Sequence, residues 1–146
     1  MIDLLIQGAR VVDVHTDAQL DVAVTDGTII AIGETLPHHA EQQIDGSGLV
    51  LLPGGIDPHV HFNEPGRTNW EGFETGSRAL VKGGMTSFFD MPLNSTPPTT
   101  TVDAFDTKRQ LADDLSVANA YLWGGLVPDN LDQLEGLAAR DVIGFK

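Results

Sequence analysis

The stretch PGGIDPHVH, residues 53–61, joins a turn to a short apolar strand that ends in two histidines. Successive side chains of a strand point to opposite faces, so His59 and His61 should project together while Val60 packs inward. Two imidazoles on one face could share a metal ion. A His-x-His pair is a weak signal alone, and two unrelated histidines are the competing interpretation. The stretch therefore predicts a strand with a candidate metal site at its end.

Strand-like and helical patterns alternate after this stretch. Thr68 with Glu71 fits a capping box, which predicts a helix from there to about Val81. The further predictions are a strand over 85–90, a helix over 103–115, a strand over 117–123, a helix over 130–139 and the start of a strand over 142–146. Such alternation with short links predicts a parallel sheet and an α/β fold. No Gly-x-Gly-x-x-Gly follows any of these strands, so a dinucleotide-binding fold has no support.

Residues 1–50 show a different sequence pattern, in which short apolar runs are separated by turn residues. Asp26-Gly27 lies between two such runs and is typical of a β-hairpin. We therefore expect a small β layer before the alternating region. Three histidines, His15, His38 and His39, lie in polar, turn-like surroundings and are expected at the surface.

Composition narrows the classes of function. The 146 residues carry a formal net charge of −13, which disfavours binding to a nucleic-acid backbone. No apolar run approaches the roughly 20 residues of a membrane-spanning helix, so no membrane partner is expected. The N-terminus lacks the pattern of a signal peptide, and the sequence contains no cysteine. These features favour a cytoplasmic protein without disulfides.

The stretch over 53–61 resembles the first-strand motif of the amidohydrolase superfamily, in which Pro-Gly-x-Ile-Asp-x-His-x-His is typical. Further segments resemble the cyclic-amidase branch of that superfamily: NEPGR at 63–67, WEGF at 70–73, GGMT at 83–86, DMPLNS at 90–95, PPT at 97–99 and GFK at 144–146. The resemblance covers the whole chain. It implies that residues 1–50 are the N-terminal part of a β-sandwich domain. Residues 51–146 would be the first four β/α units, or first half, of a (β/α)8 TIM-like barrel.

The resemblance also implies a binuclear metal centre. His59 and His61 would bind one divalent ion, and Lys146 would be carboxylated on its amine and bridge that ion to a second. A carbamate presents two oxygens and a negative charge, which an ammonium cannot. Zinc is the expected metal, and manganese, cobalt and iron are alternatives that these ligand types accept. For Lys146 taken alone, a surface lysine is the competing interpretation.

The activity implied by the resemblance is hydrolysis of a cyclic amide. Relatives that hydrolyse dihydroorotate usually carry arginine at the position of Asn63, where the guanidinium pairs with a carboxylate. Asn63 suits an uncharged ureido group, and with Asn94 it is expected to contact the substrate. These details favour the opening of allantoin to allantoate, with dihydroorotase or hydantoinase (dihydropyrimidinase) activity as the first alternative. A non-catalytic binding or assembly subunit is the alternative from another class.

The implied site is incomplete within residues 1–146. It requires two further histidines and a general-base aspartate from later strands, so no catalytic residue is assigned and these residues alone are expected to be inactive. Two hypotheses explain why the chain ends at Lys146. The chain is truncated at this residue, or a carboxylated Lys146 interrupts the sequence of a longer protein. The complete protein is expected to act on a small molecule and, from the resemblance, to form a homotetramer.

Overall fold

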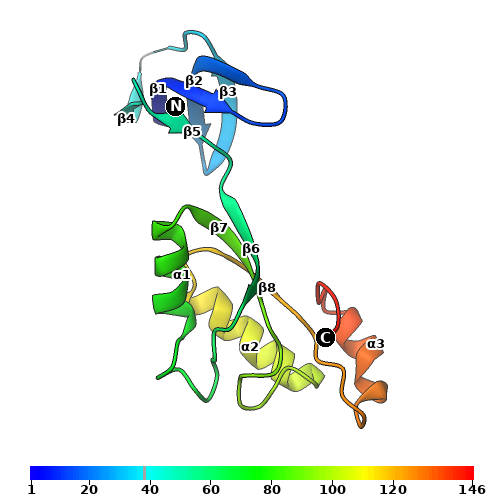
Figure 1. The fold of residues 1–146 in the computed structure, drawn as a ribbon. Helices are drawn as coiled ribbons and strands as arrows, with labels where there is room; N and C mark the ends of the chain where they lie inside the picture. The colour runs from blue at the N-terminus through cyan, green and yellow to red at the C-terminus, as the bar shows by residue number, and fades with distance from the viewer. Residues whose placement is uncertain (38) are drawn as a thin grey trace. The chain divides into compact units, whose positions relative to one another are not determined.

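The computed structural model describes residues 1–37 and 39–146. The chain forms two compact units, Met1–Pro53 and Gly54–Lys146, and each is described by itself (Figure 1). His15 and His39 are exposed, as predicted, whereas the prediction for His38 lies outside the described residues. Among residues 1–37 and 39–146, every helix is too short or too polar to span a lipid bilayer.

The first unit is a single β-sheet. Its strands are β1 (Ile2–Val12), β2 (Asp17–Thr25), β3 (Thr28–Gly33), β4 (Ala40–Asp45) and β5 (Val50–Leu51). The strand order is β3-β2-β1-β4, and β5 pairs with β1. β2 is antiparallel to β1 and β3, whereas β4 and β5 run parallel to β1. Asp26 and Gly27 have φ values of 50° and 69°, which is the left-handed backbone that the predicted two-residue hairpin turn requires.

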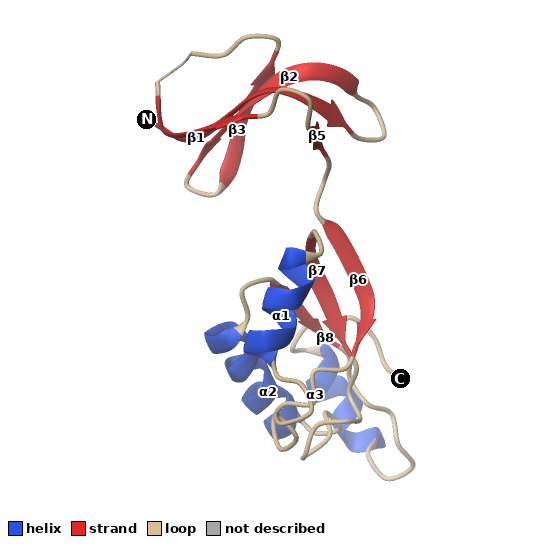
Figure 2. Ribbon diagram, turned by 60° about the vertical axis from the view of Figure 1, so that its left-hand side comes forward, coloured by secondary structure: helices blue, strands red, loops and turns tan. Residues whose placement is uncertain are grey.

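The second unit alternates strands and helices, as predicted (Figure 2). Its elements are β6 (Gly55–Val60), α1 (Phe73–Lys82), β7 (Met85–Asp90), α2 (Val102–Leu115), β8 (Asn119–Leu122), the short 3-10 helix η1 (Leu131–Gln133) and α3 (Leu134–Ala138). The strands form a parallel sheet in the order β6-β7-β8. Because α1 and α2 each connect two neighbouring strands, the carboxyl ends of all three strands lie at one edge of the sheet.

Aromatic side chains form the centre of the core in the second unit. Phe62, Phe73 and Phe88 pack against one another with ring centroids between 4.8 and 6.3 Å apart. Helix α2 contributes Phe105 to the same cluster, and Val60 is buried in it, as predicted. Tilted and edge-to-face aromatic contacts of this kind fix the ends of β6 and β7 against the helices.

Residues 142–146 run beside β8 but form only an isolated bridge, between Gly124 and Phe145. Hydrogen bonds extend this pairing. The Gly124 N–H donates to the Gly144 oxygen and the Lys146 N–H donates to the Gly124 oxygen, both at 2.9 Å. These slanted bonds follow the pattern of parallel strands. The predicted start of a fourth strand is therefore present as a short parallel pairing.

The start of α1 differs from the prediction. The helix begins at Phe73, so the capping box assigned to Thr68 and Glu71 is wrong. The carboxylate of Glu64 takes this role, because its Oε2 accepts a hydrogen bond from the Phe73 backbone N–H at 2.8 Å. Its Oε1 accepts a second bond from the Thr68 hydroxyl at 3.1 Å. A buried carboxylate outside the helix thus satisfies one of the free N–H groups at its N-terminus.

Candidate metal centre

The two histidines of the first-strand motif converge at the carboxyl end of β6. The Nε2 atoms of His59 and His61 lie 3.2 Å apart, and their ring centroids are 5.2 Å apart. Two neutral imidazoles at this distance can share a proton, with the donor set by the tautomer. The two nitrogens can instead point at one cation. The structure therefore brings together the first two residues of the site expected from the sequence.

A bulge in β6 includes the first histidine. Strand β6 advances three residues from Asp57 to Val60 where β7 advances two. Pro58 lies in this segment and has no backbone N–H to donate to the neighbouring strand. The Asp57 carboxylate accepts a hydrogen bond from the His59 backbone N–H at 3.0 Å. The regular pleat expected from the sequence is therefore interrupted just before and at the first histidine.

The surroundings of His61 favour its neutral imidazole form. Partial burial lowers the pKa of His61 from its ordinary value, and the nearby positive charges of His59, Lys146 and Lys108 lower it further. Burial and cations both disfavour the imidazolium form. Neutral imidazole keeps a lone pair available, and this is the form that binds metal.

Lys146 lines the same pocket as the first histidine. The pocket has a volume of about 260 Å3 and is lined by His59, Met91, Trp123, Phe145 and Lys146. The segment that carries Lys146 passes close to Trp123, since a Cβ on Gly144 would lie 2.6 Å from Cζ3 of the indole. That distance is too short for any side chain. Glycine at this position therefore allows residues 142–146 to approach β8 and brings Lys146 to the strand ends.

The two asparagines expected to contact substrate lie on different loops. Asn63 follows His61 by two residues and is buried, and its Oδ1 has no hydrogen-bond partner among the described residues. Its backbone N–H donates to the Glu71 backbone oxygen at 3.0 Å, and this bond fixes the loop after β6. Asn94 is half-buried in the loop after β7. Neither asparagine is among the residues that line the pocket of His59 and Lys146.

Sequence reasoning missed a buried cation next to this site. Lys108 projects from α2 and forms an ion pair with Asp90, and both side chains are almost completely buried. Burial raises the pKa of Asp90, although Lys108 and two backbone N–H groups act in the opposite direction. Lys108 is three residues after Phe105 and four before Ala112, so it falls on the inner face of the helix. A charged residue at an inward position was the signal that could have identified it.

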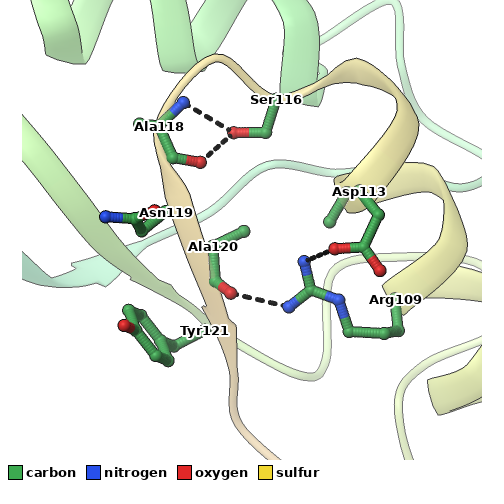
Figure 3. Close-up of a pocket in the computed structure, with 8 residues that line it drawn as sticks. Arg109, Asp113, Ser116, Ala118, Asn119, Ala120 and Tyr121 are labelled. Carbon is green, nitrogen blue, oxygen red and sulfur yellow. Dashed lines mark hydrogen bonds and ion pairs between the residues drawn. The ribbon is translucent and has the colours of Figure 1, made fainter. Parts of the chain in front are cut away.

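A second pocket lies at the other end of β8, where that strand begins (Figure 3). Its volume is about 330 Å3, and its lining includes Arg109, Asp113, Ser116 and Asn119. The Arg109 guanidinium donates to the Ala120 oxygen at 2.6 Å and pairs with Asp113 (Figure 3). In open and closed parallel sheets, ligands bind at the carboxyl ends of the strands. The engaged charges and the position of this pocket make it a structural feature rather than a candidate site.

The histidine pair fits a tetrahedral metal ion. Two nitrogens bound about 2.0–2.1 Å from one zinc ion stand roughly 3.3 Å apart, close to the observed separation of 3.2 Å. Among residues 1–37 and 39–146, no group of three or more histidine, cysteine, aspartate or glutamate side chains gathers around one point. Two imidazoles complete half of a tetrahedral shell, so further ligands are needed for tight binding.

Comparison with known proteins places the chain among relatives of similar sequence. The amidohydrolase family model matches residues 50–142. A protein of Solibacter usitatus named allantoinase is 53% identical over 146 residues, and one of Bacillus velezensis with the same name is 44% identical over 144. These alignments cover 100% and 99% of this chain but 32% of each relative. The chain therefore spans about a third of the length of the curated relatives it matches.

Solved structures show the same fold. The L-hydantoinase (dihydropyrimidinase) from Arthrobacter aurescens has a TM-score of 0.92 at 32% identity, over 99% of this chain and 32% of its own. A D-hydantoinase from a Thermus species has a TM-score of 0.80 at 24% identity, over 97% of this chain and 32% of its own, and shows the fold alone. The predicted fold class, α/β with the first half of a TIM-like barrel, is confirmed.

Proposed function

We propose, from the fact that this chain belongs to the amidohydrolase family, that it carries part of the active site of a hydrolase that opens a cyclic amide. The complete protein would be an allantoinase, converting allantoin to allantoate. The observation that carries this proposal is the convergence of the His59 and His61 Nε2 atoms at the strand ends. Lys146 lines the pocket beside them, and relatives at 44% and 53% identity are named allantoinase.

The chain's own residues would hold a divalent metal centre. Nε2 of His59 and of His61 would bind one ion, for which zinc suits the imidazole ligands and manganese, cobalt or iron are the alternatives. The neutral amine of Lys146 would add to the carbon of CO2 and release one proton, which gives a carbamate with two ligand oxygens. Bound metal ions lower the pKa of water and polarise a carbonyl group, which is the chemistry that amide hydrolysis requires.

The asparagines would orient the substrate. The buried Oδ1 of Asn63 has no protein partner among the described residues, so it can accept a hydrogen bond from a ring or ureido N–H. A buried acceptor that stays unpaired is costly, and a substrate that supplies the donor removes this cost. Asn94 would provide a second polar contact from the loop after β7. An uncharged amide suits allantoin, whereas the carboxylate of dihydroorotate calls for an arginine.

Hydantoinase activity is the second candidate. The observation that favours it is the likeness to the L-hydantoinase of Arthrobacter aurescens, with a TM-score of 0.92. The sequence identity to that protein is 32%, against 53% to the allantoinase of Solibacter usitatus. Substrate preference in such enzymes depends on pocket contacts rather than on the fold, so the greater sequence similarity favours allantoin.

We also propose the domain organisation, the cellular location and the oligomeric state of the complete protein. Residues 1–50 would be part of a β-sandwich domain, and residues 51–146 the first four β/α units of the barrel. The uncovered isoleucines of β3, namely Ile29, Ile30 and Ile32, are consistent with a sheet that packs against further strands. A cytoplasmic location rests on the absence of cysteine, and a homotetramer rests on the family resemblance alone.

Steady-state kinetics of the complete protein test this proposal. Hydrolysis of allantoin, hydantoin and dihydroorotate is compared at equal concentrations of metal-loaded protein. A kcat/KM for allantoin at least about tenfold above the other two supports the proposal. Preference for hydantoin would move the assignment to the second candidate. Metal-loaded, folded protein that hydrolyses none of the three would favour the non-catalytic alternative.

A further inference from the structure

A buried ion pair contacts the backbone next to the histidine pair. Asp90 is the last residue of β7 and Lys108 projects from α2, and their side chains are 0% and 1% exposed. Phe62, whose backbone N–H donates to Asp90, belongs with Phe88 and Phe105 to the apolar core. Removing two charges from water costs about as much as their attraction returns, so such a pair is weak evidence for stability. Its place beside the candidate site calls for another explanation.

The carboxylate of this pair holds the loop that follows β6. Oδ1 of Asp90 accepts a hydrogen bond from the Phe62 backbone N–H at 2.7 Å, and both groups are buried. Phe62 lies between His61 and Asn63 in the sequence. The contact therefore fixes the backbone between a candidate metal ligand and a candidate substrate contact.

The ammonium of the pair holds the loop that follows β7. Nζ of Lys108 donates to the Met91 backbone oxygen at 3.3 Å and to the Ser95 hydroxyl at 3.5 Å. These two residues stand on either side of Asn94 in the sequence, and Met91 also lines the pocket of Lys146. A single buried cation thus fixes the loop at two points around the second candidate substrate contact.

We propose that Asp90 and Lys108 are positioning residues that hold the loops over 62–67 and 91–101 in fixed positions relative to one another. Through this pair, Asn63 and Asn94 are held so that both meet the same bound substrate. The inference rests on the proposed function, because it assigns these residues a part in binding the cyclic amide. Neither residue touches the substrate, and the effect is transmitted through the Phe62 N–H, the Met91 oxygen and the Ser95 hydroxyl.

The double variant Asp90→Asn/Lys108→Met of the complete protein tests the inference. Both charges disappear together, so no unpaired charge is left in the core, and the new amide keeps an oxygen that can accept from the Phe62 N–H. The contacts to Met91 and Ser95 are lost. We expect KM for allantoin to rise roughly tenfold while kcat falls less than about threefold and metal content stays at the wild-type value, because binding rather than chemistry is impaired.

Arg140→Met is the matched control. It removes an ion pair between Arg140 and Asp106 of the same helix α2, but this pair is exposed at 38% and 51%. We expect its KM, kcat and thermal midpoint to equal those of the wild type. A merely structural role of the buried pair would lower the thermal midpoint of the double variant and leave KM unchanged in the folded fraction.

The outcomes distinguish failure of this inference from failure of the proposed function. A folded double variant with the wild-type KM overturns the inference and leaves the proposed function intact. A wild type that hydrolyses no cyclic amide overturns both. If the double variant does not fold, the variant Ser95→Ala tests the inference instead. It removes the contact between Lys108 and the Ser95 hydroxyl without changing a charge. A rise in KM of roughly twofold to fivefold then supports the inference, and an unchanged KM overturns it.

Discussion

The Nε2 atoms of His59 and His61 lie 3.2 Å apart at the end of a bulged strand. The bulge arises where Pro58 cannot donate to the neighbouring strand and the Asp57 carboxylate accepts from the His59 N–H. The separation matches two ligands of one tetrahedral ion. The candidate metal centre therefore depends on this histidine pair and on the residues that surround it.

Lys146→Met should remove the bridging ligand. In the complete protein, native mass spectrometry of the wild type should show the added mass of one CO2 per chain, and the variant should lack it. Metal content should fall from roughly two ions per chain to one or fewer, because the second ion loses its carbamate oxygen. Lys82→Met, at the exposed C-terminal turn of α1, is the control and should retain both signals. A wild type without the CO2 mass in native spectra would contradict the carbamate.

Gly144→Ala should displace the segment that carries Lys146. The added Cβ would lie 2.6 Å from Cζ3 of Trp123, so either the indole or the segment over 142–146 must shift. We expect the metal content of the complete protein to fall and its free energy of unfolding to decrease by about 1–3 kcal/mol in urea titrations. Gly33→Ala is the matched control, since its Cβ would meet Leu36 at an ordinary 3.5 Å. Equal metal content in the two variants would contradict this account of Gly144.

Asn63→Arg should shift substrate preference towards a carboxylate. A guanidinium pairs with a carboxylate through two parallel hydrogen bonds. It has no acceptor for the N–H groups of an uncharged ureido group. The ratio of kcat/KM for dihydroorotate to that for allantoin should rise at least about tenfold over the wild type. Asn69→Arg, on the exposed part of the same loop, should leave the ratio unchanged. If both variants keep the wild-type ratio, Asn63 does not contact the substrate.

Glu64→Ala should weaken the start of α1. The buried Phe73 N–H would lose its acceptor, which costs about 1–3 kcal/mol of unfolding free energy. Glu64→Gln should cost less, because its amide oxygen can still accept this bond. Chemical denaturation of the variants measures these differences, with Glu41→Ala at an exposed position of β4 as the control. A Glu64→Ala protein as stable as the control would assign the cap to another group.

Local sequence patterns predicted most of the fold. The Asp26-Gly27 hairpin requires two residues with positive φ, and this need is visible in the residue types themselves. The parallel sheet followed from alternating strand and helix patterns, whose periods of 2 and 3.6 residues are local properties. The pairing over 142–146 was also visible as an apolar run, although the strand is shorter than expected.

Contacts between distant residues were harder to predict. The Glu64 cap of α1 joins residues nine positions apart, and the Asp90 contact with the Phe62 N–H joins residues 28 apart. Neither follows from propensity, because each depends on where the fold places two loops. The candidate ligands His59, His61 and Lys146 came from motif and resemblance. Their assignment as metal ligands stays a prediction, as does the assignment of Asn63 and Asn94 to substrate binding.

Metal content and allantoin hydrolysis, both measured on the same complete protein, test whether His59 and His61 hold a catalytic metal centre. The wild type should bind roughly two divalent ions per chain and hydrolyse allantoin. His59→Asn/His61→Asn should lose at least one ion and lower kcat at least about a thousandfold, while His15→Asn, at an exposed turn, should match the wild type. A wild type that binds no metal, or a histidine double variant that keeps both ions and full activity, would contradict the account.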